Sequence, residues 1–221
     1  MCGRFTITLE PADLQEELGL GDFPEDFIPR YNVAPTQPVP VVRDAIKKNV
    51  EWMRWGLVPF WAKDPAIGVK MINARSETIE EKPSFREAFN SRRCLLLADG
   101  FYEWQKGIGK ERSIPHYFHL NKSKPFFLAG LWDSWKDTQG VPLLSCTIIT
   151  CAANELVGKI HDRMPVILDA STAWNWLKPA SRNDLRQMLN PYPANQMTGY
   201  VVGTGVNSTL AESRELVQPL E

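Results

Sequence analysis

Cys2 is the residue of this sequence whose position most directly suggests covalent chemistry. It follows the initiator methionine in the opening MCGRF. Initiator methionine is normally removed when the next residue is small, so we predict a mature chain that begins with Cys2. Such a residue carries both a free α-amine and a thiol. The amine can attack an aldehyde, and the thiol can then close a five-membered ring on the same carbon.

A second group of polar residues lies in MINARSE, where Asn73, Arg75 and Glu77 occur at a period of two. In an extended backbone this spacing projects all three side chains to one face. They could therefore line a polar site together. A solvated strand face with no further role fits the same pattern.

Glu103 and His161 are candidates for proton transfer. Glu103 stands between aromatic residues in ADGFYEW, after an apolar run. Apolar surroundings raise the pKa of a carboxylic acid towards neutrality, which suits a proton carrier. His161 is flanked by Asp162 and Arg163 in KIHDRMP, which suits a proton shuttle near an anion. A surface glutamate at a strand end and a structural histidine remain the alternatives.

The remaining histidines and cysteines do not indicate a metal or cofactor site. His116 and His119 lie three apart in an expected strand, which places them on opposite faces. Cys94, Cys146 and Cys151 form no CxxC motif, and we expect all cysteines to be reduced.

Composition indicates a globular protein with its own core. The chain has 221 residues, of which 43% are hydrophobic, and a net charge of −1 from 25 basic and 26 acidic residues. This balance gives no overall attraction to nucleic acids or membranes, so any DNA affinity must be local. Neither a leader peptide nor an apolar run long enough to span a membrane is apparent, so we expect a cytoplasmic protein.

Hydrophobic patterns predict an α+β fold in a single domain spanning residues 1–221, with a large, mostly antiparallel and strongly bent sheet. A strand over 1–9 leads into a helix over 10–20, which starts with Pro11 and stops at Gly19. The long loop 58–71 carries Phe60 and Trp61, which indicates a functional loop. Further strands are expected at 38–43, 50–55, 94–104, 115–120, 125–132, 143–150, 164–168 and 199–207. Helices are expected at 82–93, 152–160, 171–177 and 181–189. Ser171 and Ser181 are the expected N-caps of the last two helices.

Six motifs in order along the chain together resemble the SOS response-associated peptidase family, an abasic-site processing group. They are MCGRF, RYNVAP, WGLVPFW, INARSET, ADGFYEW and HDRMPVIL. The resemblance implies a bifurcated, largely antiparallel, barrel-containing β-sheet surrounded by short helices. It also implies a covalent reaction with abasic sites in single-stranded DNA, by a monomer without cofactor or metal that associates with the nucleoid during DNA damage.

The same resemblance assigns roles to individual residues. Cys2 would be the nucleophile, Asn73 would contact the ring-forming end, Glu103 would position and protonate, and His161 would assist opening of the sugar ring. Phosphate contacts would come from Arg4, Arg75 and Arg163, with Thr150 as a weaker polar contact. Trp61 and Phe60 would stack against bases, and Asn32 and Pro35 would line the same groove. Ala62 stands where some relatives carry a second tryptophan, a departure that bears on base stacking.

Two other functions fit the same residues. One is an N-terminal cysteine peptidase or autopeptidase that uses Cys2, Glu103 and His161 on a peptide bond. The other is a noncovalent reader of modified DNA bases, which would need no free α-amine.

Overall fold

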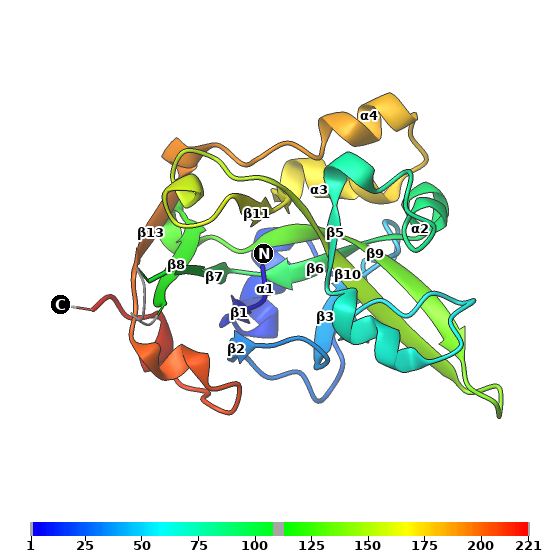
Figure 1. Ribbon diagram of the computed structural model, residues 1–221, viewed down its shortest axis with the longest axis horizontal. Helices are drawn as coiled ribbons and strands as arrows, with labels where there is room; N and C mark the ends of the chain where they lie inside the picture. The colour runs from blue at the N-terminus through cyan, green and yellow to red at the C-terminus, as the bar shows by residue number, and fades with distance from the viewer. Residues whose placement is uncertain (1, 108–112, 221) are drawn as a thin grey trace.

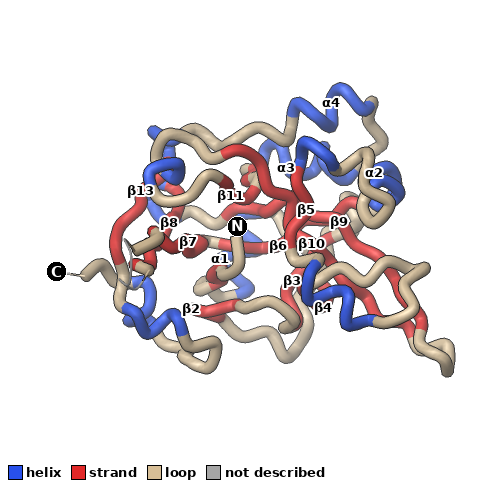
Figure 2. The backbone as a smooth tube through the Cα atoms, in the orientation of Figure 1, coloured by secondary structure: helices blue, strands red, loops and turns tan. Residues whose placement is uncertain are grey.

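Alternating and apolar segments of the chain form two β-sheets in the computed structural model, which describes residues 2–107 and 113–220 (Figures 1 and 2). The first sheet has the strand order β13-β8-β7-β1-β2 and is antiparallel in every pairing. Its strands are β1 (Phe5–Ile7), β2 (Arg30–Val33), β7 (Gly100–Gln105), β8 (Ile114–Leu120) and β13 (Met197–Val201).

The second sheet contains a closed barrel. β10 pairs with both β4 and β9, so β10, β4, β3, β6 and β9 form a ring. The far end of β10 leaves this ring and pairs with β5 and β11 instead, which makes the sheet bifurcated, as predicted. The strands are β3 (Pro38–Val42), β4 (Glu51–Trp55), β5 (Asn73–Arg75), β6 (Arg93–Ala98), β9 (Phe126–Lys136), β10 (Pro142–Ala152), β11 (Arg163–Pro165) and β12 (Ile167–Leu168).

The strand predicted over 94–104 is in fact two strands that belong to different sheets. The chain turns at Asp99, which is 4% exposed and lies between β6 and β7. Its carboxylate accepts hydrogen bonds from the hydroxyls of Thr6 and Thr8, at 2.5 and 2.7 Å. A buried carboxylate needs such donors, and Thr6 in β1 and Thr8 just after β1 supply them. The prediction of one continuous strand was therefore wrong.

Four short α-helices lie around the sheets in the described part of the chain (Figure 2). The first begins at Pro11 and ends at Gly19, whose φ of +64° closes the helix in the left-handed conformation, as the sequence predicted. Leu14 and Leu18 bury its inner face. The helices are α1 (Pro11–Leu18), α2 (Arg86–Ser91), α3 (Ala170–Leu177) and α4 (Arg182–Gln187).

Some N-caps and element lengths differ from those predicted from the sequence. Asp169, not Ser171, caps α3, because its carboxylate accepts the amide hydrogens of Ser171 and Thr172. Ser181 caps α4 as predicted. The helix expected over 152–160 is only a 3₁₀ turn at Val157–Lys159. The Asn154 side-chain oxygen Oδ1 accepts the amide hydrogens of Leu156 and Val157 just before this turn. The late strand ends at Val201, and residues 204–207 form another 3₁₀ turn.

Helix α3 packs on the barrel through a buried tryptophan. Trp176 is fully buried, and its indole nitrogen lies 3.1 Å from the Cys94 carbonyl and 3.3 Å from the Gly130 carbonyl. Gly130 lies in β9 between β6 and β10. A Cβ atom there would stand 2.5 Å from Leu96 Cδ1 and 2.9 Å from the Thr147 carbonyl oxygen. The barrel wall therefore has no room for a side chain at this position.

Gly130→Ala is expected to destabilise the protein by about 1–3 kcal/mol, because the added methyl group overpacks the barrel. The measurement is the urea midpoint of unfolding followed by tryptophan fluorescence. Gly203→Ala is the matched control, since nothing lies within 4 Å of its added Cβ and its φ of −63° suits alanine. Equal midpoints for the two variants would contradict the packing argument.

Candidate active site

The pairing of β1 with β7 places Cys2 inside the molecule. Phe5 lies opposite Phe101, and the Tyr102 amide donates to the Arg4 carbonyl at 3.0 Å. The same register, continued by two residues, sets Gly3 opposite Glu103. The Cys2 side chain is 0% exposed, and the start of the chain lies near the middle of the face seen in Figure 1.

Asn73 connects the second sheet to Cys2. Parallel pairing with β10 sets Asn73 beside Ile148, and the Asn73 side-chain amide donates to the Cys2 carbonyl oxygen at 2.8 Å. The Asn73 Oδ1 atom is buried and has no hydrogen-bond partner among the described residues. This oxygen can accept a hydrogen bond from a molecule bound next to Cys2.

Glu103 is a buried acid that interacts with both Cys2 and His161. Its side chain is 2% exposed, as its aromatic neighbours predicted. Burial raises the pKa of Glu103, while the charge of His161 acts in the opposite direction. Burial also raises the pKa of the Cys2 thiol, and the negative charge of Glu103 raises it further. Burial therefore opposes the charged form of both groups.

His161 is held in one orientation by the backbone just after it. Its Nδ1 atom accepts the Arg163 amide hydrogen at 3.0 Å. Asp162 also approaches Nδ1 at 3.0 Å, but that side chain is 85% exposed, so we assign the backbone amide as the partner. In the neutral ring the hydrogen then lies on Nε2, which becomes the donor of the imidazole.

Three of the predicted phosphate contacts lie together where β10 passes between β5 and β11. Thr150 is opposite Arg75 on one side and Pro165 on the other. Arg163 Nη2 donates to the Thr150 carbonyl oxygen at 2.6 Å. The Arg75 side chain is exposed. The structure thus assembles one basic edge from residues far apart in the sequence.

Glu77 does not continue the strand as its spacing predicted. It lies in a 3₁₀ turn, Ser76–Thr78, that follows β5 directly. The turn redirects its carboxylate to the Arg163 guanidinium, which it binds with both oxygens, at 2.5 and 2.9 Å. This ion pair lowers the pKa of Glu77. The sequence contains no signal for the pair, because 86 positions separate the two residues.

Arg4 and Asn32 are buried among protein groups. Arg4 Nη1 donates to Asn32 Oδ1 at 2.6 Å and to the Val206 carbonyl at 2.7 Å. The Asn32 amide donates to the carbonyls of Ser208 and Ala211, both at 2.8 Å. These bonds tie β1 and β2 to the C-terminal segment, a supporting role that the sequence analysis missed.

Pro35, the other residue predicted from RYNVAP, is half-buried just after β2. Its backbone nitrogen carries no hydrogen and cannot donate a hydrogen bond. Burial lowers the pKa of Arg4. Direct DNA contacts of Arg4, Asn32 and Pro35 stay predictions, and the geometry favours support of the N-terminal strand.

Phe60 and Trp61 project from a turn that is fixed at both sides. Phe60 is 53% and Trp61 48% exposed, which is unusual for such large aromatic rings. The Phe60 amide donates to Asp133 Oδ2 at 3.1 Å, and the Trp135 indole donates to the Ala62 carbonyl at 2.7 Å. Asp133 was missed, although a charge inside the apolar run of β9 is a sequence signal for it.

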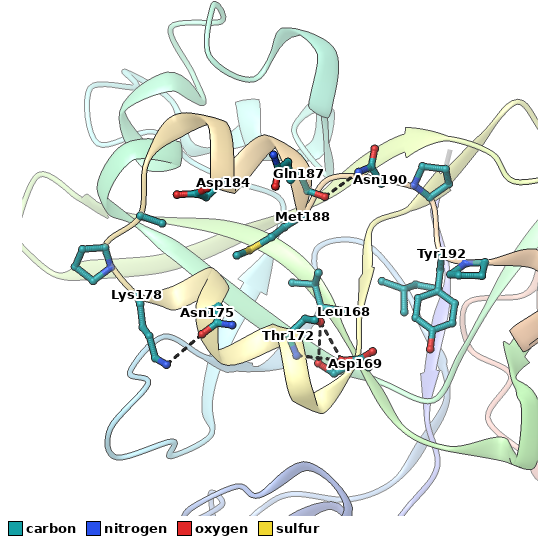
Figure 3. Close-up of a pocket in the computed structure, with 15 residues that line it drawn as sticks. Leu168, Asp169, Thr172, Asn175, Lys178, Asp184, Gln187, Met188, Asn190 and Tyr192 are labelled. Atoms are coloured by element: carbon teal, nitrogen blue, oxygen red, sulfur yellow. Dashed lines mark hydrogen bonds between the residues drawn. The ribbon is translucent and has the colours of Figure 1, made fainter.

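A pocket away from Cys2 lies between α3 and α4 (Figure 3). It has a volume of about 610 Å³, and its lining includes Leu168, Lys178, Met188 and Tyr192. None of the predicted site residues lines it.

Within residues 2–107 and 113–220, no group of histidine, cysteine or acidic side chains is arranged to hold a metal ion. No described helix is long and apolar enough to cross a membrane.

Comparison with known proteins gives a consistent result. The family model described as SOS response associated peptidase (SRAP) matches residues 1–209. Abasic site processing protein YoqW from Bacillus subtilis (strain 168) is 45% identical over 223 residues, covering 99% of each chain. Abasic site processing protein HMCES from Gallus gallus is 34% identical and covers all of this chain and 78% of its own. A crystal structure of a Bacteroides thetaiotaomicron protein aligns with a TM-score of 0.85 at 27% identity, covering 98% of this chain and 100% of its own.

The interaction of Glu103 with Cys2 can be tested by alkylation. Glu103→Gln removes the negative charge that raises the Cys2 pKa, so more thiolate forms at a given pH and iodoacetamide should react with Cys2 several-fold faster. The rate is followed between pH 7 and 10 by mass spectrometry of the Cys2 peptide. Glu87→Gln is the control, because it removes a charge from an exposed surface pair with Arg92. An unchanged rate in Glu103→Gln would show that the two groups do not interact.

Proposed function

Because this chain belongs to the SOS response associated peptidase (SRAP) family, we propose that it processes abasic sites in single-stranded DNA by covalent capture at Cys2. The observation that carries the proposal is that Asn73 and Glu103 both interact with the buried Cys2 at the start of the chain, and that His161 interacts with Glu103. The names of the relatives, abasic site processing proteins, support the same substrate.

The chemistry requires removal of Met1, because the Cys2 nitrogen must be an amine and not an amide. The ring-opened abasic sugar presents an aldehyde. The neutral amine adds to its carbon, and loss of water gives an imine. The Cys2 thiol then adds to the same carbon, its proton passes to nitrogen, and a thiazolidine ring results. The thiol is tethered to the amine, so this closure has the advantage of an intramolecular reaction, for which effective molarities of roughly 10⁵ M or more are known.

The surrounding residues have roles that follow from their contacts. Glu103, whose pKa is raised by burial, donates a proton to the departing hydroxyl and takes one back later. Asn73 holds the Cys2 carbonyl, which fixes the direction of the amine and the thiol. His161, whose Nδ1 atom accepts the Arg163 amide hydrogen, would donate its Nε2 hydrogen to the sugar oxygen during ring opening. No cofactor is needed for any of these steps.

The DNA backbone would be held at the basic edge formed by Arg75, Thr150 and Arg163. Phosphate contacts of this kind position a strand without reading its sequence. Phe60 and Trp61 offer exposed faces on which bases next to the lesion stack. Since covalent capture needs correct placement more than strong reversible binding, a few local arginines suffice despite the net charge of −1.

Lyase activity is a second outcome of the same intermediate. Loss of a proton from the sugar carbon next to the imine expels the 3′ phosphate and breaks the strand. The Cys2 thiol competes with this elimination, since ring closure consumes the imine. The balance between the two outcomes therefore depends on how well the thiol is aligned.

A crosslinking assay tests the proposal. Purified protein incubated with single-stranded DNA that carries one abasic site should give a band that survives heat and SDS. Cys2→Ala should abolish the stable band. Cys2→Ser keeps the amine and loses stable ring closure, so strand cleavage should persist while the crosslink is lost. Absence of the band with intact wild-type protein would refute the proposal.

The N-terminus supplies the decisive control. A variant with an alanine inserted before Cys2 that is retained in the mature chain should fold normally by circular dichroism and form no crosslink, because the Cys2 nitrogen is then an amide. Mass spectrometry establishes that each preparation carries the intended first residue. An N-terminal autopeptidase without DNA activity would lose Met1 and form no band, and a noncovalent reader would bind DNA equally well with the alanine in place.

A further inference from the structure

Glu77 and Arg163 form an ion pair with two hydrogen bonds at the basic edge. Arg163 directs two nitrogens at the two oxygens of one carboxylate. Its side chain is only 11% exposed, whereas the Glu77 side chain is 51% exposed. The carboxylate therefore lies on the solvent side of the guanidinium and covers it.

A carboxylate and a phosphate bind a guanidinium in the same way. Both present two oxygens that fit the two parallel N–H groups of arginine. Arg163 is held from the protein side by the Thr150 carbonyl at 2.6 Å, so its orientation does not depend on Glu77 alone. The guanidinium is thus fixed in place for an anion, and the protein supplies that anion itself.

We propose that Glu77 occupies the position of a DNA phosphate and must be displaced before Arg163 can bind the backbone. This inference rests on the proposed function, because it takes Arg163 to be a phosphate contact. Glu77 then sets how selective the protein is. A strand without a lesion gains little from displacing the carboxylate, whereas a strand whose abasic sugar enters the Cys2 site has additional contacts that offset the loss of the ion pair.

Removal of the charge should therefore strengthen binding to undamaged DNA. In a Cys2→Ala background, which prevents covalent capture, Glu77→Gln should bind intact single-stranded DNA about five- to tenfold more tightly at low salt. The slope of log K against log salt should steepen by roughly 0.7, the value for one phosphate of a single strand. Fluorescence anisotropy of a labelled oligonucleotide at several salt concentrations measures both quantities.

The chain offers a matched control in Glu80. It lies three residues further along and also binds an arginine with both oxygens, Arg186 at 2.6 and 3.0 Å. The Arg186 side chain is 63% exposed and belongs to α4, whereas the basic edge is formed by β5, β10 and β11. Glu80→Gln removes the same charge from the same segment, so it should change affinity much less than Glu77→Gln.

A double variant shows whether Glu77 acts through Arg163. Glu77→Gln combined with Arg163→Gln should bind no more tightly than Arg163→Gln alone. Three outcomes would each overturn the inference. They are an affinity gain that persists without Arg163, an equal affinity gain in Glu80→Gln, and no affinity gain in Glu77→Gln. Circular dichroism melts confirm that the variants compared are folded. Failure here is separate from failure of the proposed function, which is decided by whether the wild-type protein forms the crosslink.

Discussion

The structure depends on one constraint, which is that the start of the chain must be held inside the fold. Chain ends are normally exposed and poorly ordered, yet Cys2 is fully buried. β1 is fixed on both edges by β2 and β7. Arg4 ties it to residue 206 near the other end of the chain, and Asn73 holds Cys2 from the second sheet. Both sheets and the C-terminal segment therefore serve to position one residue.

Burial divides the site into a buried centre and a charged edge. Around Cys2 burial raises the pKa of both the thiol and the Glu103 carboxyl group, because an ion there loses hydration. The guanidinium of Arg163 lies at the rim, where Glu77 balances its charge. The buried surroundings of Cys2 suit a reaction that involves proton transfer and loss of water. The edge at Arg163 suits binding of the DNA backbone, which is a polyanion. A fully basic site would have raised affinity for any nucleic acid.

The sequence predicted what depends on local patterns and missed what depends on contacts between distant residues. The limits of α1 follow from Pro11 and Gly19, and the burial of Glu103 follows from its aromatic neighbours. Asp99 before Gly100 is a typical turn pair, but the hydroxyls of Thr6 and Thr8 that hold its carboxylate could not be predicted, because they lie 93 and 91 positions away. The Glu77 ion pair depends on a turn that no periodicity indicates. The proposed catalytic residues were assigned from six motifs taken together, since no single motif specifies their roles.

Irreversible capture changes what reversible binding has to achieve. A protein that binds and releases its ligand needs affinity to reach occupancy, whereas one that forms a stable bond needs only enough residence time for the amine to reach the aldehyde. High affinity for intact DNA would then be a disadvantage, because undamaged strands vastly outnumber lesions and would sequester the protein. A near-neutral chain, a few arginines and a carboxylate that covers one of them are consistent with this requirement. Under the proposed function, the chemistry of Cys2 distinguishes a lesion from normal DNA, and the carboxylate of Glu77 limits the binding of intact strands that would compete with it.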